Sequence, residues 1–374
     1  MDFELNEDQK EMRKKVREFA EKEIAPLERD LVKEGKPEFP EELVGKLNEV
    51  GLWGLSVPEQ YGGLDVDGVS YAIAIEEIAR VSPSIAIVLF NHTANGTLPI
   101  LIFGSDEQKE KYLPKLASGE YIASFALTEP VAGSDVSAIQ STAERDGDEY
   151  VLNGHKWFIT NAFGDIINVF AYTNREKGTK GMSCFIVEKG TPGMKIGRVF
   201  HIMGAHSTED AELLFENCRV PKENLIGNEG DGFKIALHTL DHARIGLAAT
   251  CLGISQGSLE ASIRYAKERN VFGAPIANLQ AIQWMIADMA TELEAARMLV
   301  YRAGSMKKPG ARFTTEAAMA KLFASEAAMR AASKAIQIHG SHGTLRNLPI
   351  TKLTEIMGGT SEVMRMVIAR SFLK

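Results

Sequence analysis

The chain has 374 residues, 45% of them hydrophobic and 25% charged, a balance that is typical of a globular protein with a large core. Its formal net charge of −8 argues against binding to nucleic acid or to an anionic membrane. No apolar run approaches the roughly 20 residues that cross a bilayer, and the charged beginning MDFELNEDQKEMRKKV is unlike a signal peptide. We therefore expect two or three domains and no nucleic-acid or membrane partner.

The N-terminal third of the chain carries apolar side chains at helical spacing. DQKEMRKKVREFAEKEIAPLERDLV predicts one amphipathic helix, and PEFPEELVGKLNEVGLWGL predicts a second after a proline. Residues 68–104 are nearly apolar and predict two more helices, which we expect to be buried. An all-α N-terminal domain over residues 1–120 follows from this pattern.

Short, alternating apolar runs replace helical spacing from Tyr121 to about Leu225. The runs are YVLNGHKWFITNA, INVFAYT, MSCFIVEKGTPG, MKIGRVF and AELLFENCRVP. Each predicts a strand, so we expect a middle β domain over residues 121–226.

Helical spacing returns after GNEGDGF and persists to the end of the chain. The long apolar-periodic segments lie at about 231–269, 275–305 and 313–340. They predict a helical domain over residues 227–374, and the fold class is therefore α+β.

The cysteines indicate the compartment. Cys184, Cys218 and Cys251 are more than 30 residues apart, so their spacing does not suggest a pair of metal ligands, and we expect no metal site. Buried free thiols in a reducing environment are the expected state, which favours the cytoplasm.

Three strings have residue types suited to a bound cofactor, although each has a plainer interpretation. FALTEPVAGSDVSA, residues 125–138, is a strand followed by a loop whose backbone N–H groups can approach a phosphate or a flat ring, but such loops are commonly simple turns. NGHKWFITNA, residues 153–162, places aromatic residues before Thr160 on a strand, where aromatics commonly belong to the core. KERNVFGAPI ends a long helix at Arg269, a position that is commonly solvent-exposed.

The fourth string is TEIMGGTSEVMRMVIAR, residues 354–370. Thr360 and Ser361 can cap a final helix, and Glu362 lies in its first turn. Gly358 and Gly359 stand directly before the cap and leave the backbone there without side chains.

In this order and at this spacing, LTEPVAGSD, HKWFITNA, RNVFG and GGTSEV resemble the acyl-CoA dehydrogenase family, and LSVPEQYGGL and VPKENLIG fit it as well. The resemblance covers nearly the whole chain. It implies an N-terminal helical domain, a middle β-barrel domain and a C-terminal four-helix bundle, commonly assembled as a homotetramer. It also implies FAD as the cofactor, an acyl-CoA substrate and electron-transfer flavoprotein as the electron acceptor.

The resemblance further implies roles for the residues at matching positions. Thr128 would hydrogen-bond the flavin ring, Thr160 would bind near N5, and Arg269 would reach the FAD of a neighbouring subunit. The implied FAD contacts are Phe125, Leu127, Thr128, Gly133, Ser134, Phe158, Thr160, Arg269, Phe272, Gln337, Gly340, Thr360 and Glu362. The implied substrate contacts are Asn91, Ser134, Asp241, Arg244 and Gly358.

The sequence departs from the family at the catalytic base. The family reaction removes a proton from the acyl group and passes a hydride to flavin N5, so it needs a general base opposite the flavin. Most members carry a glutamate at the position of Gly358 and a minority at the position of Ala243, and this chain has neither. The N–H of Gly358 can still polarise the thioester carbonyl. Gly358 is either a deliberate spacer or a removed glutamate, and the segment LPITKLTEIMGG before it is shorter than the family pattern.

Two other residues are candidates for proton transfer. FNHTANGTLP places Asn91 at the floor of the family's acyl pocket, with His92 beside it. A subgroup that oxidises alicyclic thioesters, such as cyclohex-1-ene-1-carboxyl-CoA, lacks the glutamate and uses an aspartate on this floor. Asn91 is isosteric with aspartate but cannot accept a proton at neutral pH. Both residues also have structural interpretations, Asn91 as a hydrogen-bonded helix residue and His92 as a core histidine.

The sequence favours FAD-dependent oxidation of an alicyclic acyl-CoA, as met in anaerobic degradation of aromatic and alicyclic compounds. One alternative is a short- or branched-chain dehydrogenase whose glutamate has been removed. The other is a non-catalytic protein that binds flavin or acyl-CoA.

Overall fold

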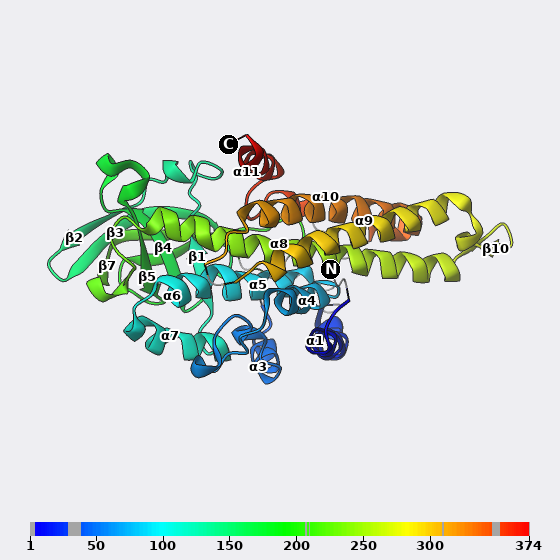
Figure 1. Cartoon of the computed structure of the whole chain (residues 1–374), viewed down its shortest axis with the longest axis horizontal. Coiled ribbons are helices and arrows are strands. Elements are labelled where there is room, and N and C mark those ends of the chain that lie inside the picture. Colours follow the sequence, from blue (N-terminus) through cyan, green and yellow to red (C-terminus); the bar gives the residue numbers. More distant parts are fainter. Residues whose placement is uncertain are drawn as a thin grey trace.

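The computed structural model describes residues 4–28, 39–205, 208, 210–308, 310–345 and 352–373. It forms an elongated molecule with a β-sheet at one end, helices at the centre and a helical hairpin that projects at the other end (Figure 1). Helices, strands and helices follow one another along the chain, as the apolar spacing predicted.

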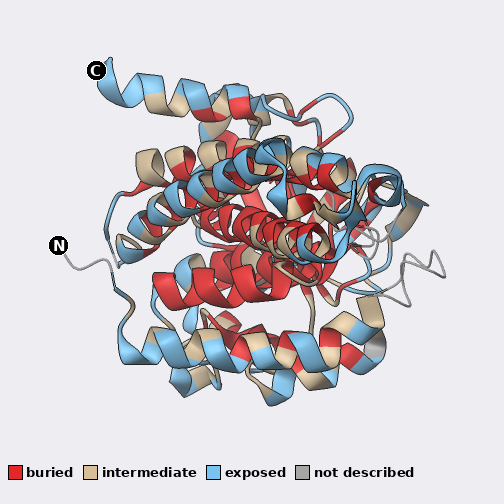
Figure 2. Cartoon of the chain, turned by 90° about the vertical axis from the view of Figure 1, so that its right-hand side faces the viewer, coloured by how far each residue is buried: buried red, intermediate tan, exposed pale blue. Residues whose placement is uncertain are grey.

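The N-terminal helices begin at sequence signals for capping. Asn6 forms a capping box with Gln9, the Asp67 carboxylate accepts from two backbone N–H groups, and Ser82 precedes a helix that starts with proline. The helices are α1 (Glu7–Phe19), α3 (Glu41–Glu49), α4 (Gly68–Ala79), α5 (Pro83–Phe90), α6 (Thr97–Phe103) and α7 (Asp106–Ser118). α4 and α5 are buried on all sides, and Figure 2 shows the buried residues gathered in the helices at the centre.

A π-helical turn, η4 (Asn91–Gly96), joins α5 to α6. Pro83–Phe103 thereby becomes one helical segment of 21 residues, long and apolar enough by length and composition to cross a membrane. The expectation that no apolar run approaches this length was therefore wrong. Most of the segment is buried inside the protein, so its apolar character is accounted for by the core.

The middle of the chain forms a mixed sheet in which paired strands run in the order β6-β7-β3-β2-β4-β5-β8, and β1 pairs with β4 in parallel. The strands are β1 (Ala123–Ala126), β2 (Thr142–Asp146), β3 (Glu149–Ile159), β4 (Ile166–Tyr172), β5 (Met182–Glu188), β6 (Met194–Val199), β7 (Ala211–Pro221) and β8 (Leu225–Ile226). All five predicted strand runs are confirmed. β4 is buried along its whole length, and β1 packs against the π-helical turn η4.

The C-terminal helices are α8 (Gly232–Glu268), α9 (Gln280–Ser305), α10 (Thr314–His339) and α11 (Ser361–Phe372). Alanines on α10 allow close packing against α8 and α9, and α11 lies on α10. α8 and α9 extend beyond the rest of the molecule and carry the short strands β9 (Asn270–Val271) and β10 (Ala274–Pro275) near the tip (Figure 1). The predicted cap of the last helix is confirmed, since the Thr360 side chain accepts a hydrogen bond from the N–H of Val363.

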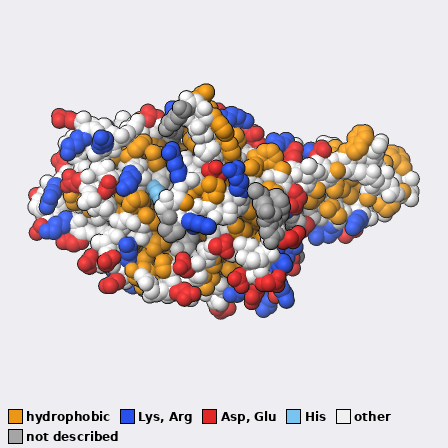
Figure 3. Space-filling view, in the orientation of Figure 1, with side chains coloured by type: hydrophobic (Ala, Val, Ile, Leu, Met, Phe, Trp, Pro, Cys, Tyr) orange, Lys and Arg blue, Asp and Glu red, His pale blue; other side chains and the backbone are white. Residues whose placement is uncertain are grey.

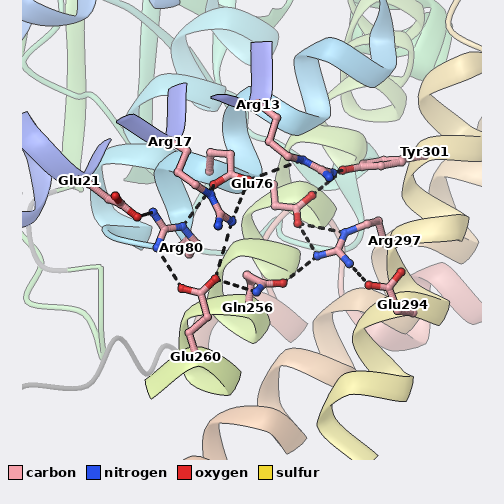
Figure 4. A network of polar contacts seen from close by, with 11 residues as sticks. Arg13, Arg17, Glu21, Glu76, Arg80, Gln256, Glu260, Glu294, Arg297 and Tyr301 are labelled. Atoms are coloured by element: carbon pink, nitrogen blue, oxygen red, sulfur yellow. Dashed lines mark hydrogen bonds and ion pairs between the residues drawn. The ribbon is translucent and has the colours of Figure 1, made fainter. Parts of the chain in front are cut away.

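Buried ion pairs join the N-terminal helices to the C-terminal bundle (Figure 4). Glu76 on α4 accepts hydrogen bonds from Arg297 Nη2 at 2.7 Å and from the Tyr301 hydroxyl at 2.8 Å. Arg80 donates to Glu260 on α8 at 3.0 Å. Because a buried carboxylate is stable only with such partners, these contacts fix how the two helical layers meet. The three cysteines are buried and free, as predicted.

Candidate active site

The floor of the candidate site is the π-helical turn at Asn91. Its side-chain amide donates to the carbonyl oxygen of Thr160 at 3.1 Å and accepts from Asn95 at 2.9 Å. Isolated π-turns of this kind occur frequently at functional sites. The buried Asn91 therefore links the helical floor to the end of β3.

His92 is not available as a base, and this corrects one of the sequence candidates. The ring is fully buried beside Trp53, Nε2 is 3.0 Å from the carbonyl oxygen of Leu116, and Nδ1 accepts from the N–H of Ala123 at 3.0 Å. Burial lowers the pKa of His92 to about 4. Both nitrogens are engaged by the backbone, so the interpretation as a core histidine holds.

The end of β3 has the strained backbone that is typical of functional sites. Phe158 and Asn161 both have positive φ, at 53° and 57°, on either side of Thr160, and the pairing with β7 shifts register between Lys156 and Ile159. The distortion turns the Phe158 ring outward, where 52% of the residue is exposed and it stacks on Phe200 with ring centroids 4.4 Å apart.

The loop after β1 is tied to this end of β3. The N–H of Trp157 donates to the carbonyl oxygen of Thr128 at 2.9 Å, and Lys156 forms a buried ion pair with Glu129 at 2.7 Å. Burial lowers the pKa of Lys156 to about 8, although Glu129 opposes this shift. Two strings that lie far apart in the sequence therefore form one surface, with Thr128 beside Trp157.

The other residues of this loop are placed as a cofactor surface requires. Phe125 is half-buried and packs on Phe170, whereas Leu127 is buried. Gly133 and Ser134 are exposed, and a side chain at Gly133 would meet nothing within 4 Å, so the backbone there is open to a ligand. The exposed Phe158 ring, the neighbouring hydroxyls and this open loop fit a flat ring joined to a phosphate.

The backbone conformation explains why residues 358 and 359 are both glycine. Gly358 has φ +63° and Gly359 has φ +102°, and both values favour glycine strongly. A Cβ on Gly358 would lie 3.1 Å from Leu247 Cδ2 on α8. Lys321, fully buried on α10, donates to the carbonyl oxygen of Gly359 at 2.9 Å. The sequence offered no signal for this lysine, whose pKa burial lowers to about 8.

One face of α8 runs between the glycines and the floor. Leu247 contacts Gly358, and one turn earlier Ala243 packs with Ala94 and Leu98 beside the π-turn. Neither Gly358 nor Ala243 can supply a carboxylate. Ordinary proton removal next to the thioester therefore lacks its base at both expected positions.

α8 also carries a group of polar residues, Asp241 and Arg244 with His238 and His242, which we call the polar track. Asp241 accepts from Arg244 at 2.5 Å and from Thr314 at 2.5 Å. The Nε of Arg244 and the Nδ1 atoms of His238 and His242 are buried and have no hydrogen-bond partner among the residues that the structure describes. Such unpaired groups in a row fit an elongated polar ligand that would satisfy them.

Four of the residues expected to contact the cofactor lie far from Thr128 and Thr160 of the same chain. Arg269 and Phe272 are exposed at the tip of the α8–α9 projection, and Phe272 is 100% exposed with φ 50°. Gln337 and Gly340, at the end of α10, lie near the same tip, where His339 stacks on Tyr265 at 4.4 Å. The end of β3 and the loop after β1 form a surface with Thr128, Trp157 and Phe158, which we call the Phe158 surface. The four residues above lie away from it in the same chain (Figure 1).

The projection also exposes large apolar side chains. Figure 3 shows hydrophobic side chains gathered over it, and Trp284 is 61% exposed. Thr360 and Glu362 lie at the start of α11, close to the paired glycines. In the described part of the chain, no group of His, Cys, Asp and Glu side chains is arranged to hold a metal ion.

Comparison with known proteins agrees with this geometry. Three sequence models match the chain: acyl-CoA dehydrogenase N-terminal domain at residues 6–120, middle domain at residues 124–218 and C-terminal domain at residues 230–373. An acyl-CoA dehydrogenase of Bacillus subtilis (strain 168) is 47% identical over 376 residues, covering 99% of each chain.

Solved structures are similar over the full length. Butyryl-CoA dehydrogenase from Megasphaera elsdenii is 41% identical with a TM-score of 0.96, covering 100% of both chains. A chain described with the electron transferring flavoprotein of Acidaminococcus fermentans is 46% identical with a TM-score of 0.97, covering 100% of both chains. The structure of PigA with FAD and proline is 32% identical with a TM-score of 0.94, covering 100% of this chain and 99% of that one.

Proposed function

The chain belongs to the acyl-CoA dehydrogenase family, and from that premise we propose that it oxidises an alicyclic acyl-CoA such as cyclohex-1-ene-1-carboxyl-CoA. It is an oxidoreductase that acts on acyl-CoA thioesters, and its cofactor is FAD. The alicyclic acyl group is the part that is proposed.

The observation that carries the proposal is the backbone at Gly358. A residue in the left-handed region with Leu247 at 3.1 Å from its Cβ position is poorly suited to a glutamate. Together with the small Ala243, this leaves the space beside the thioester without a carboxylate from residue 243 or 358. A ring fills such a space better than a straight chain does, and its reacting carbon can lie deeper in the pocket.

The residues of the chain then have separate tasks. FAD, when bound, accepts the hydride at N5. The N–H of Gly358 polarises the thioester carbonyl, and the polar track of Asp241 and Arg244 holds the CoA part. Asn91 occupies the floor and directs the ring, but its amide cannot take a proton, so in the parent protein the proton would pass to solvent water and the reaction would be slow. An aspartate at this position would accept the proton and is expected to speed the reaction.

The test is anaerobic bleaching of bound FAD by a set of thioesters. Cyclohex-1-ene-1-carboxyl-CoA should reduce the flavin of Asn91→Asp at least about 100-fold faster than that of the parent protein. Asn217→Asp, which places a carboxylate at an exposed position of β7, is the control and should not do so. Rapid bleaching by butyryl-CoA with no response to any cyclic thioester would contradict the proposal.

A second candidate is a short-chain acyl-CoA dehydrogenase that lacks its glutamate. The similarity to butyryl-CoA dehydrogenase favours it. It predicts that adding a glutamate restores fast oxidation of butyryl-CoA and leaves cyclic thioesters inert. The ring proposal predicts that cyclic thioesters remain the better substrates of the parent protein.

We also propose that copies of the chain share their cofactor sites within a homotetramer. Arg269 and Phe272 lie on the projection, far from Thr160 of the same chain, so they can contact FAD only in another copy. The similarity to a chain described with an electron transferring flavoprotein supports such a protein as the electron acceptor. Light scattering and reduction of the purified acceptor test the two statements.

A further inference from the structure

Asp210 is a buried acid that no sequence motif singled out. It lies directly before β7, and its residue is 5% exposed. One carboxylate oxygen accepts from the Thr160 hydroxyl at 2.7 Å, and the other accepts from the Thr208 hydroxyl. Within the described part of the chain, Asp210 has no cationic partner, and burial raises its pKa.

Burying a carboxylate without a cation costs stability, so such a residue is expected where it serves a function. The neighbours of Asp210 indicate one. Thr160 lies between the exposed Phe158 and the buried Asn161, which both have positive φ, and its carbonyl oxygen accepts from Asn91 and Ser124. The carbonyl oxygen and the hydroxyl hydrogen of Thr160 are therefore both held by other residues, the hydrogen by Asp210.

We propose that Asp210 is a positioning residue that orients the Thr160 hydroxyl so that its lone pairs face the flavin edge. When Thr160 donates to the carboxylate, its oxygen can only accept from a ligand. An acceptor at this edge favours reduced FAD, which carries a hydrogen at N5, over oxidised FAD, which carries a lone pair there. Asp210 thus raises the tendency of the bound flavin to take electrons. This inference rests on FAD binding at the Phe158 surface and on neither proposed substrate.

The alternative is that Asp210 only holds β7 to the end of β3. The N–H of Phe200 donates to the Asp210 carbonyl oxygen at 2.8 Å, and the N–H of Asn161 donates to the Thr208 carbonyl oxygen at 3.3 Å. These bonds involve the backbone alone and would survive a change of the side chain. A purely structural Asp210 therefore predicts a change in stability without a change in the flavin.

The test is the midpoint potential of bound FAD, measured with redox dyes and without any thioester. Asp210→Leu keeps roughly the size of the side chain but removes both acceptor oxygens, so the Thr160 hydroxyl loses the partner that fixes its direction. We expect the ratio of reduced to oxidised flavin at a fixed potential to fall roughly tenfold, the effect of one hydrogen bond. Thr160→Val should give the same fall, and Thr160→Ser should retain the parent value.

The double variant Asp210→Leu/Thr160→Val decides between the two roles. We expect the same potential as for either single variant, because both changes remove one interaction. Asp146→Leu, at an exposed acid on β2 that pairs with Arg219, is the control and should leave the potential unchanged. An unchanged potential in Asp210→Leu, additive shifts in the double variant, or loss of FAD from a folded Asp210→Leu would each overturn the proposal.

The parent protein also permits a test without substitution. With isotope-labelled aspartate, the infrared difference between oxidised and reduced enzyme should contain a carboxyl band, because the bond from Thr160 changes strength with the state of the flavin. Absence of any labelled band would overturn the proposal even if Asp210→Leu fails to fold.

Discussion

Replacing Gly358 by alanine tests whether the paired glycines are a built feature of the site. The residue has φ +63°, a conformation that disfavours an L side chain by about 1 to 2 kcal/mol. The added Cβ would also lie 3.1 Å from Leu247 Cδ2, which must move by a few tenths of an ångström. Gly358→Ala should therefore lower the apparent melting temperature of the FAD-bound protein by about 1 to 3 °C for a chain of this length.

The matched control is Gly45→Ala on α3. Nothing lies within 4 Å of a Cβ at Gly45, so the same substitution should stabilise the helix by about 0.5 to 1 kcal/mol. Gly359→Ala should destabilise more than Gly358→Ala, since φ +102° is more restricted to glycine and Met364 Cε lies 2.7 Å from its Cβ position. A Gly358→Ala protein as stable as the parent would refute this reasoning and favour a removed glutamate at this position.

Three further outcomes are expected. Glu76→Gln removes the buried carboxylate of Arg297 and leaves that guanidinium only the exposed Glu294 carboxylate among the described residues, so it should destabilise the protein by about 1 to 3 kcal/mol in urea unfolding. Glu294→Gln should have little effect, because the buried Glu76 remains. Burial lowers the pKa of His92 from the usual 6.5 to about 4, so the neutral ring stabilises the folded protein above pH 6.5 and this contribution is lost as the pH falls toward 4. His92→Gln should therefore flatten the stability–pH profile between these values, as measured by urea unfolding. Lys321→Met removes the donor to Gly359, so amide hydrogen exchange in α11 should become faster, while Lys334→Met should leave it unchanged; equal exchange in both would contradict the role of Lys321.

The elements of the fold could be predicted because each has a local signal. Helical spacing, alternating strands and the cap at Thr360 are properties of short segments, and the structure confirms them. The apolar segment Pro83–Phe103 was misjudged because the polar residues of the π-turn divide it in the sequence. In the structure those residues are buried and continue the helix.

The site could be predicted only where a motif marks it. The strings around Thr128 and Thr160 point to one surface, but the bond that joins them, from Trp157 to Thr128, depends on the packing of β1 against β3. Asp210 lies in no recognisable motif, since its bond to Thr160 arises from the pairing of Ile159 with Ala211 across β3 and β7.

His92 is a second residue whose role the sequence alone does not decide. A histidine on an apolar helix has the same appearance in a sequence whether its nitrogens are free or bonded. The partners that exclude catalysis, Leu116 and Ala123, are 24 and 31 residues away. The domain boundaries at residues 120 and 226 remain predictions, and the shortened segment before Gly358 lies partly outside the described residues.

The most direct measurement of the central claim is rapid anaerobic mixing of the FAD-bound protein with butyryl-CoA. The account holds that the site binds flavin and thioester but has no carboxylate at residues 243 and 358. We predict slow bleaching in the parent protein and an acceleration of about 10² to 10⁴ in Ala243→Glu once the neighbouring Ala94 and Leu98 have adjusted to the longer side chain. Fast bleaching in the parent protein, with no gain from Ala243→Glu, would show that another base already acts next to the thioester.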